Sequence, residues 1–136
     1  MSTAIADGKA AWARLQQGSP TWDDWIRIGH VLREGRAIAM RNAGTVNPTG
    51  SYYSRAFHAW LRAYGFQGIS QTQRTNLMAV MTHLAEIEAW RSTLTSAQLA
   101  RLNDPGRVML HYREAIGAVR GRAKPSGRTR SLEPAS

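Results

Sequence analysis

Apolar residues recur at three- and four-residue steps along most of the chain, whereas the alternation expected of strands is absent over any useful length. This pattern predicts an all-α protein, a compact bundle of five to seven helices that contains a helix-turn-helix unit. The expected helices cover residues 3–17, 21–41, 52–64, 70–90, a short stretch from 95, and 105–120. The fourth of these either continues to Trp90 or breaks near Thr82.

Local signals mark where several of these helices begin and end. Thr21 precedes two aspartates that would lie at the positive end of a helix dipole. The tetrapeptides that start at Ser70 and Thr95 match the reciprocal capping box, in which two side chains satisfy two backbone N–H groups. Gly65 suits a left-handed cap, and Asp104 before a proline predicts another helix start.

The composition divides the chain into three segments. Residues 1–19 are expected to form either a weak helix or a disordered arm, because their apolar stripe is short. Residues 20–120 form the helical domain, with a mobile loop at residues 42–51. Residues 121–136 contain a single large apolar residue, Leu132, which predicts a disordered basic tail.

Positive charge is abundant and unevenly placed. Eighteen lysines and arginines against nine aspartates and glutamates give a formal net charge of +9, which attracts polyanions. Between Gly35 and Ala85 no residue is acidic, and five are arginines: Arg36, Arg41, Arg55, Arg62 and Arg74. A GC-rich genome is the alternative explanation for so many arginines, but it would not remove acidic residues from one stretch.

The helices at residues 52–64 and from Ser70 onward, joined by a short turn containing glycine, have the anatomy of a helix-turn-helix. The turn is about two residues longer than the tightest form, which leaves the register on DNA open. The first turns of the second helix carry side chains able to pair with base edges in a major groove. The predicted base-reading residues are Gln71, Gln73, Arg74 and Asn76. The alternative is an ordinary surface helix.

The chain resembles helix-turn-helix domains of unknown function from bacterial phages, plasmids and integrated elements, which share some pattern with partition-type DNA binders. The residues that carry the resemblance are Phe57-His58-Ala59-Trp60-Leu61-Arg62, then Gly68-Ile69-Ser70 and Arg74. It extends over residues 22–113. The resemblance implies a regulatory or mobile-element DNA binder and carries over no catalytic residue.

Phosphate contacts are expected from basic and hydroxyl side chains on both sides of this unit. A flexible basic arm can follow phosphates or enter a minor groove, although a solubilising tail without a partner is the alternative. The predicted phosphate-binding residues are Arg55, Arg62, Ser70, Arg120, Arg122, Lys124, Arg128 and Arg130.

Other chemistry finds little support in the sequence. There is no cysteine, the four histidines are scattered, and neither a nucleophile elbow nor a glycine-rich phosphate loop is present. We therefore expect no metal, no cofactor and no enzymatic activity. No segment approaches about 18 uninterrupted apolar residues, so we expect no membrane association and a cytoplasmic, nucleoid-associated location.

These observations together predict a sequence-specific or semi-specific DNA-binding protein, a transcriptional regulator of a phage or mobile element. Residues 20–120 would be its DNA-binding domain, and the helix from Ser70 would read the bases. The expected partners are double-stranded DNA, a second copy of the chain, and RNA polymerase or another regulator. The alternative is a helical protein-interaction module that binds an acidic partner such as a polymerase subunit.

Overall fold

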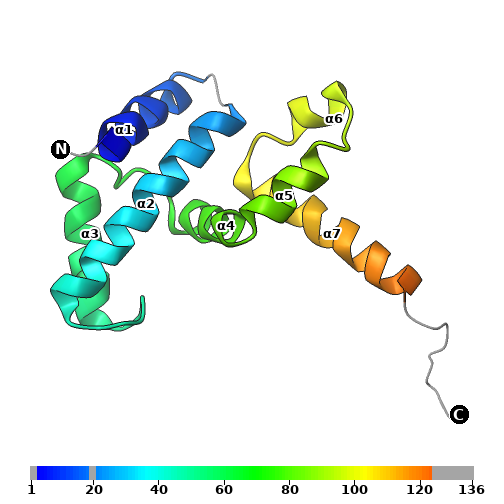
Figure 1. Ribbon diagram of the computed structural model, residues 1–136. Helices are drawn as coiled ribbons and strands as arrows, with labels where there is room; N and C mark the ends of the chain where they lie inside the picture. The colour runs from blue at the N-terminus through cyan, green and yellow to red at the C-terminus, as the bar shows by residue number, and fades with distance from the viewer. Residues whose placement is uncertain (1–2, 19–20, 124–136) are drawn as a thin grey trace, which may run out of the picture.

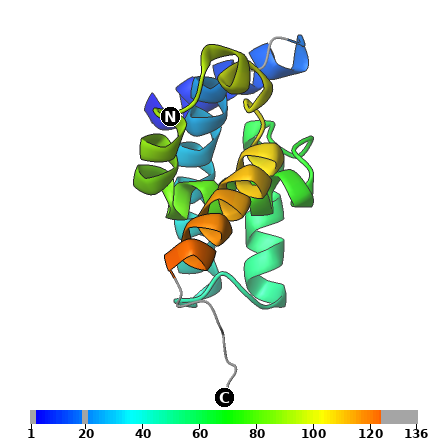
Figure 2. The ribbon, with the colours of Figure 1, turned by 90° about the vertical axis from the view of Figure 1, so that its right-hand side faces the viewer.

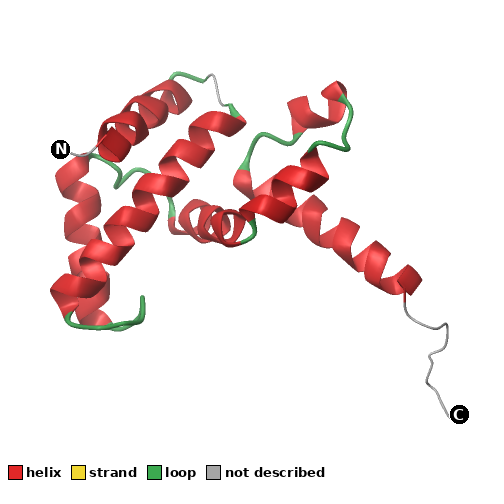
Figure 3. Ribbon diagram, in the orientation of Figure 1, coloured by secondary structure: helices red, strands yellow, loops and turns green. Residues whose placement is uncertain are grey.

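The computed structural model describes residues 3–18 and 21–123, without the side chains of residues 118–123. Over these residues the predicted all-α fold is confirmed, with helices and no strand (Figure 3). In chain order the helices are α1 (Thr3–Gln16), α2 (Trp22–Ala43), α3 (Ser51–Tyr64), α4 (Gln71–Thr82), α5 (Leu84–Arg91), α6 (Ser96–Arg101) and α7 (Pro105–Ala123).

The helix starts follow the local signals in the sequence. The Thr21 hydroxyl accepts a hydrogen bond from the backbone N–H of Asp24 at 3.1 Å. Both capping boxes form, at Ser70 and at Thr95, each with its side-chain amide three residues on. Gly65 ends α3 in the left-handed region with φ of 80°. These four signals are short-range, so neighbouring residues alone are enough to specify them.

Two hydrophobic clusters share α4. The first lies among α1, α2, α3 and the start of α4 and includes Leu77, while the second lies among α4, α5 and α7 and includes Val80. Figure 1 shows α1–α3 on one side of α4 and α5–α7 on the other, and Figure 2 views the side on which α7 lies in front. We call the two sides the first lobe and the second lobe. Trp22, at the start of α2, packs in the second cluster, so it forms a second connection between the lobes besides α4.

The segment before α2 is a helix packed into the first lobe, which is one of the two alternatives that the sequence left open. Ile5, Gly8 and Ala11 are buried where α1 meets α2. A Cβ atom at Gly8 would lie only 2.5 Å from Cγ1 of Val31, so the two backbones approach closely. Small residues weaken the apolar stripe of this helix in the sequence, but they allow α1 to pack closely against α2.

The helix that begins after Ser70 breaks rather than continuing to Trp90. The backbone at His83 has φ of −113°, outside the helical range, and α5 runs in a new direction after it (Figure 1). At the other end of the chain, α7 continues to Ala123, past residue 121 where the tail was expected to begin. The predicted disorder of residues 124–136 lies outside the described residues.

Arg91, only 8% exposed, ties the second lobe together. Its guanidinium donates to the carbonyl oxygen of Leu102 and lies 4.3 Å from the ring centroid of Trp22. The Trp22 indole N–H in turn donates to the Glu88 carboxylate at 3.1 Å. A buried cation is thus stabilised by a carbonyl dipole and an aromatic face, and the polar indole edge is satisfied as well.

A second close approach in the first lobe joins α2 and α3. A Cβ atom at Gly35 would lie 2.5 Å from Cε3 and Cζ3 of Trp60, a rigid ring that is itself 6% exposed. We predict that Gly35→Ala lowers the free energy of unfolding by about 1–3 kcal/mol through overpacking, despite the better helix propensity of alanine. Urea unfolding followed by circular dichroism measures the change.

Gly117 provides the matched control, because it also lies inside a helix but no atom approaches within 4 Å of its Cβ position. Gly117→Ala is expected to leave stability unchanged or to raise it by up to about 1 kcal/mol. Equal effects of the two substitutions would contradict the close approach at Gly35.

A buried carboxylate fastens α1 to α2 and makes stability depend on pH. Asp24 is 3% exposed at its side chain and accepts from the Arg14 guanidinium at 2.6 and 3.0 Å and from Arg27 at 3.2 Å. The Arg14 hydrogen bonds hold the pKa of Asp24 below its ordinary value, although burial opposes them. The stabilisation is therefore complete above the ordinary aspartate pKa and is lost as pH falls through the lower pKa of the folded state.

We predict that Asp24→Asn lowers the free energy of unfolding by about 2 kcal/mol at pH 7 and by progressively less as the pH falls through the lowered pKa of the folded state. Urea unfolding at pH 7 and at an acidic pH below the ordinary aspartate pKa measures this difference. Asp23→Asn is the control, since Asp23 lies exposed in the same turn. A loss at Asp24 that is the same at both pH values would rule out the linkage.

Candidate nucleic-acid interface

The connection between α3 and α4 is longer than in the tightest helix-turn-helix, and the structure shows why. After Gly65 the chain places Phe66 and Ile69 in the first cluster, both fully buried. Phe66 stacks on Trp60 with ring centroids 5.7 Å apart. Phe66 and Ile69 therefore anchor the longer turn, so α4 starts from a fixed position relative to α3.

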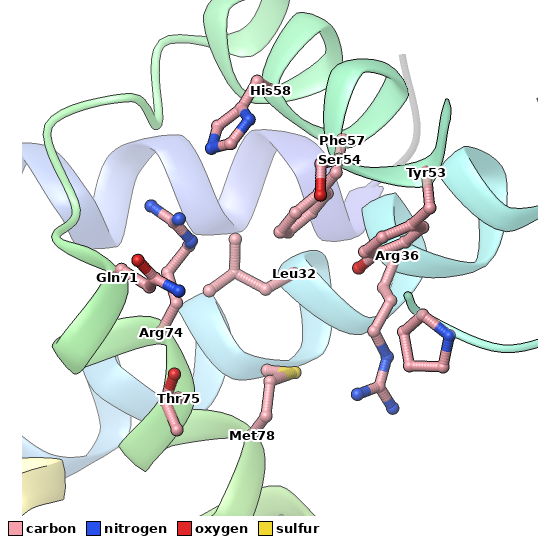
Figure 4. A pocket seen from close by; sticks show the side chains of 11 residues that line it. Leu32, Arg36, Tyr53, Ser54, Phe57, His58, Gln71, Arg74, Thr75 and Met78 are labelled. Atoms are coloured by element: carbon pink, nitrogen blue, oxygen red, sulfur yellow. The ribbon is translucent and has the colours of Figure 1, made fainter. Parts of the chain in front are cut away.

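A groove separates α3 from α4. Both helices pack on α2, and the space between them is a cavity of about 380 Å³ (Figure 4). Leu32 of α2 lies in the middle of the groove, with Phe57 of α3 and Met78 of α4 on either side. The remaining lining residues are Arg36, Pro48, Tyr53, Ser54, His58, Gln71, Arg74 and Thr75. No carboxylate is among them.

Arg74, predicted to read bases, points into this groove. Its Nη1 donates to the carbonyl oxygen of Ile69 at 2.7 Å, and its guanidinium lies 5.9 Å from the ring centroid of Phe57. Burial lowers the pKa of Arg74 below its ordinary value, but an arginine remains charged at neutral pH. The side chain is therefore a cation of the groove and not of the exposed helix surface.

The other three predicted base readers lie in three different environments. The Gln73 side chain accepts from the backbone N–H of Ser70 at 3.0 Å, as the second half of the capping box. Asn76 is half-buried near the start of α7, where its Nδ2 lies 3.4 Å from the Cβ position of Gly106. Gln71 is exposed and lies at the rim of the groove.

Two hydroxyl residues that sequence reasoning missed lie beside Gln71. Thr72 and Thr75 are exposed, and with Gln71 and Asn76 they line a shallow hollow at the start of α4. We call Gln71, Thr72 and Thr75 the polar strip. Their spacing at i, i+1 and i+4 places them on one helix face, a signal that was available in the sequence.

The predicted phosphate-binding residues have different positions. Arg55 and Arg62 are exposed on α3, and Ser70 is the cap of α4. Arg120 and Arg122 lie on the last turns of α7, but their side chains are outside the described residues. Lys124, Arg128 and Arg130 lie wholly outside them.

The groove contains one cation that the sequence prediction did not include among its site residues. Arg36 lines the groove from α2, beside Tyr53 (Figure 4). Burial raises the pKa of the Tyr53 hydroxyl above its ordinary value, while the positive charges of Arg36 and Arg74 act in the opposite direction. Both arginines are therefore close enough to influence the same hydroxyl group.

The arginines of this region have no acidic partner in the part of the chain that the structure describes. The ion pairs found there join Arg14 and Arg27 to Asp24, and join two histidines to glutamates three residues on. Arg55 lies over the ring of its neighbour Tyr52 at 5.1 Å. The positive charge of this face is therefore not neutralised within the described residues.

No known family, curated protein or solved structure matches this chain. Among the described residues, no helix is both long and apolar enough to cross a membrane. The same residues contain no group of three or more histidine, aspartate or glutamate side chains placed to hold a metal ion. Interpretation of the site therefore rests on its own geometry and charge.

Proposed function

We propose that this protein binds double-stranded DNA through the face formed by α3 and the start of α4. The observation that carries the proposal is the combination, on the two helices that border one groove, of exposed arginines on α3 without an acidic partner in the described part of the chain and an exposed polar strip on α4. Phosphate contacts with arginines supply affinity for any sequence, and polar side chains at a helix start supply discrimination among sequences.

The exposed side of α3 supports the phosphate-binding half of this proposal. Arg55 and Arg62 are exposed and lie two turns apart on α3, and α3 contains no acidic residue. His58 lies between them along the helix and faces Gln71 across the groove. A polyanion on α3 would therefore reach the polar strip without passing a carboxylate.

The rigidity of the α4 start supports the base-reading half. Ser70 and Gln73 satisfy the first backbone N–H groups of the helix, and Leu77 is fully buried one turn later. Gln71 is thus held on a fixed scaffold, and a glutamine amide can form paired hydrogen bonds with adenine. A role as a transcriptional regulator of a mobile element is part of the proposal and rests on the resemblance of residues 22–113.

Removing the exposed charges of α3 tests the phosphate contacts. We predict that Arg55→Gln with Arg62→Gln weakens binding to a labelled random duplex by about tenfold or more. The slope of log affinity against log salt should become less steep by about 1.8, because each lost phosphate contact removes about 0.9. Fluorescence anisotropy across a salt series measures both quantities.

The matched control removes two exposed arginines from the second lobe, Arg101→Gln with Arg107→Gln, and should change affinity only slightly. An equal loss in both double variants would mean that net charge alone drives binding. Affinity that ignores salt, or no binding at low salt, would refute the DNA proposal and favour the protein-interaction module.

A second pair of variants separates base reading from helix capping. We predict that Gln71→Ala reduces discrimination at particular base pairs by about 1–3 kcal/mol without loss of stability. Gln73→Ala should instead lower the free energy of unfolding by about 1 kcal/mol and leave base preference intact, because its side chain is used in the capping box. Selection of bound sites from random DNA, with urea unfolding of each variant, distinguishes the two roles. Unchanged preference in Gln71→Ala would exclude it as a base reader.

A further inference from the structure

The groove between α3 and α4 has a feature that binding of a duplex to the outer face does not use. Its interior is apolar, with Phe57 and Met78 on its walls above the fully buried Leu32, whereas its ends are cationic. In Figure 4 the guanidinium groups of Arg36 and Arg74 extend to opposite sides of Leu32. A complementary ligand would therefore carry two separate negative groups with a less polar body between them.

Arg36 and Arg74 both have N–H groups available to bind a ligand. Arg74 uses one N–H on the Ile69 carbonyl, which leaves most of the five donors of its guanidinium. Arg36 forms no ion pair among the described residues. The Tyr53 side chain also lines the groove. A tyrosine hydroxyl is protonated at neutral pH, so it is a third donor.

The size of the groove limits what can enter. A cavity of about 380 Å³ lies at the lower end of the range of small-molecule sites, about 300–1,000 Å³. Its position between two helices excludes a paired and stacked duplex. The repeating unit of a single strand meets both requirements, because each nucleoside lies between two phosphates and its base has an apolar face that packs against aromatic side chains.

We propose that the groove binds one unpaired nucleotide of a DNA strand, with its flanking phosphates on Arg36 and Arg74 and its nucleoside on Phe57 and Met78. This site extends the proposed function from paired DNA on the outer face to an unpaired position within or beside it. The two kinds of binding use different arginines, Arg55 and Arg62 for the duplex and Arg36 and Arg74 for the nucleotide.

Titration calorimetry of the full chain with thymidine 3′,5′-bisphosphate tests the site, because this compound is one nucleotide with both flanking phosphates. Its affinity should exceed that of thymidine and of inorganic phosphate by about tenfold or more. An oligothymidylate should displace it from the protein. Affinity no greater than that of inorganic phosphate, or failure of the oligothymidylate to compete, would overturn the proposal.

Substitutions locate the binding. Arg36→Gln and Arg74→Gln should each weaken bisphosphate binding by about tenfold, and Tyr53→Phe by a few-fold. Arg33→Gln is the control, since Arg33 is exposed on the same helix and does not line the groove. Arg36 forms no ion pair among the described residues, so Arg36→Gln tests the site even if Arg74→Gln is unstable. Equal effects of Arg33→Gln and Arg36→Gln would refute the groove site.

Duplex binding measured on the same variants keeps the two proposals apart. Arg55→Gln with Arg62→Gln should weaken duplex binding and leave bisphosphate binding unchanged. If the protein binds the bisphosphate but no duplex, the proposed function fails and the groove site stands. If it binds duplex but not the bisphosphate, the groove site fails and the proposed function stands.

Discussion

The backbone of α2 at Gly35 lies against the indole ring of Trp60, and the position of α3 depends on that contact. Trp60 stacks on Phe57 with centroids 6.1 Å apart and on Phe66 at 5.7 Å. Phe57 forms a wall of the groove, and Phe66 anchors the turn that leads to α4. A side chain at position 35 would displace the ring and with it both of these elements. This close approach between α2 and α3 therefore connects the wall of the groove to the turn that leads into α4.

The position of α4 between two hydrophobic clusters explains how its polar residues are divided. Leu77 faces the first cluster and Val80 the second, so two sides of a twelve-residue helix are buried. The exposed residues of α4 are the polar strip at its start and Thr82 at its end. Polar side chains outside this strip acquire partners within the protein, as Gln73 does through the Ser70 backbone and Arg74 through the Ile69 carbonyl. The same burial that fixes α4 limits how many of its side chains are free to contact a partner.

Most of the fold could be predicted from the sequence because its signals are local. The capping box at Ser70 and the left-handed cap at Gly65 involve residues within one turn of each other, so their patterns alone specify them. The site was less predictable. The direction of Arg74 depends on the Ile69 carbonyl and the Phe57 ring, whose positions depend on packing against α2. The sequence indicated that a side chain able to hydrogen-bond to base edges stands at this position. It did not indicate that the Ile69 carbonyl, in the turn before it, would accept a hydrogen bond from that side chain.

Several acidic residues elsewhere in the described part of the chain have structural partners, in contrast to the stretch around the groove, where there is no acidic residue. Asp24 binds two arginines, Glu88 accepts from the Trp22 indole, and Asp104 accepts from the backbone N–H of Arg107 at 3.1 Å at the start of α7. The stretch from Gly35 to Ala85 has no such residue, although it holds five arginines. Like charges on one face repel each other and destabilise the compact state. A polyanion bound to this face would relieve that repulsion, which is the physical reason that the charge arrangement favours the proposed ligand over a purely structural role.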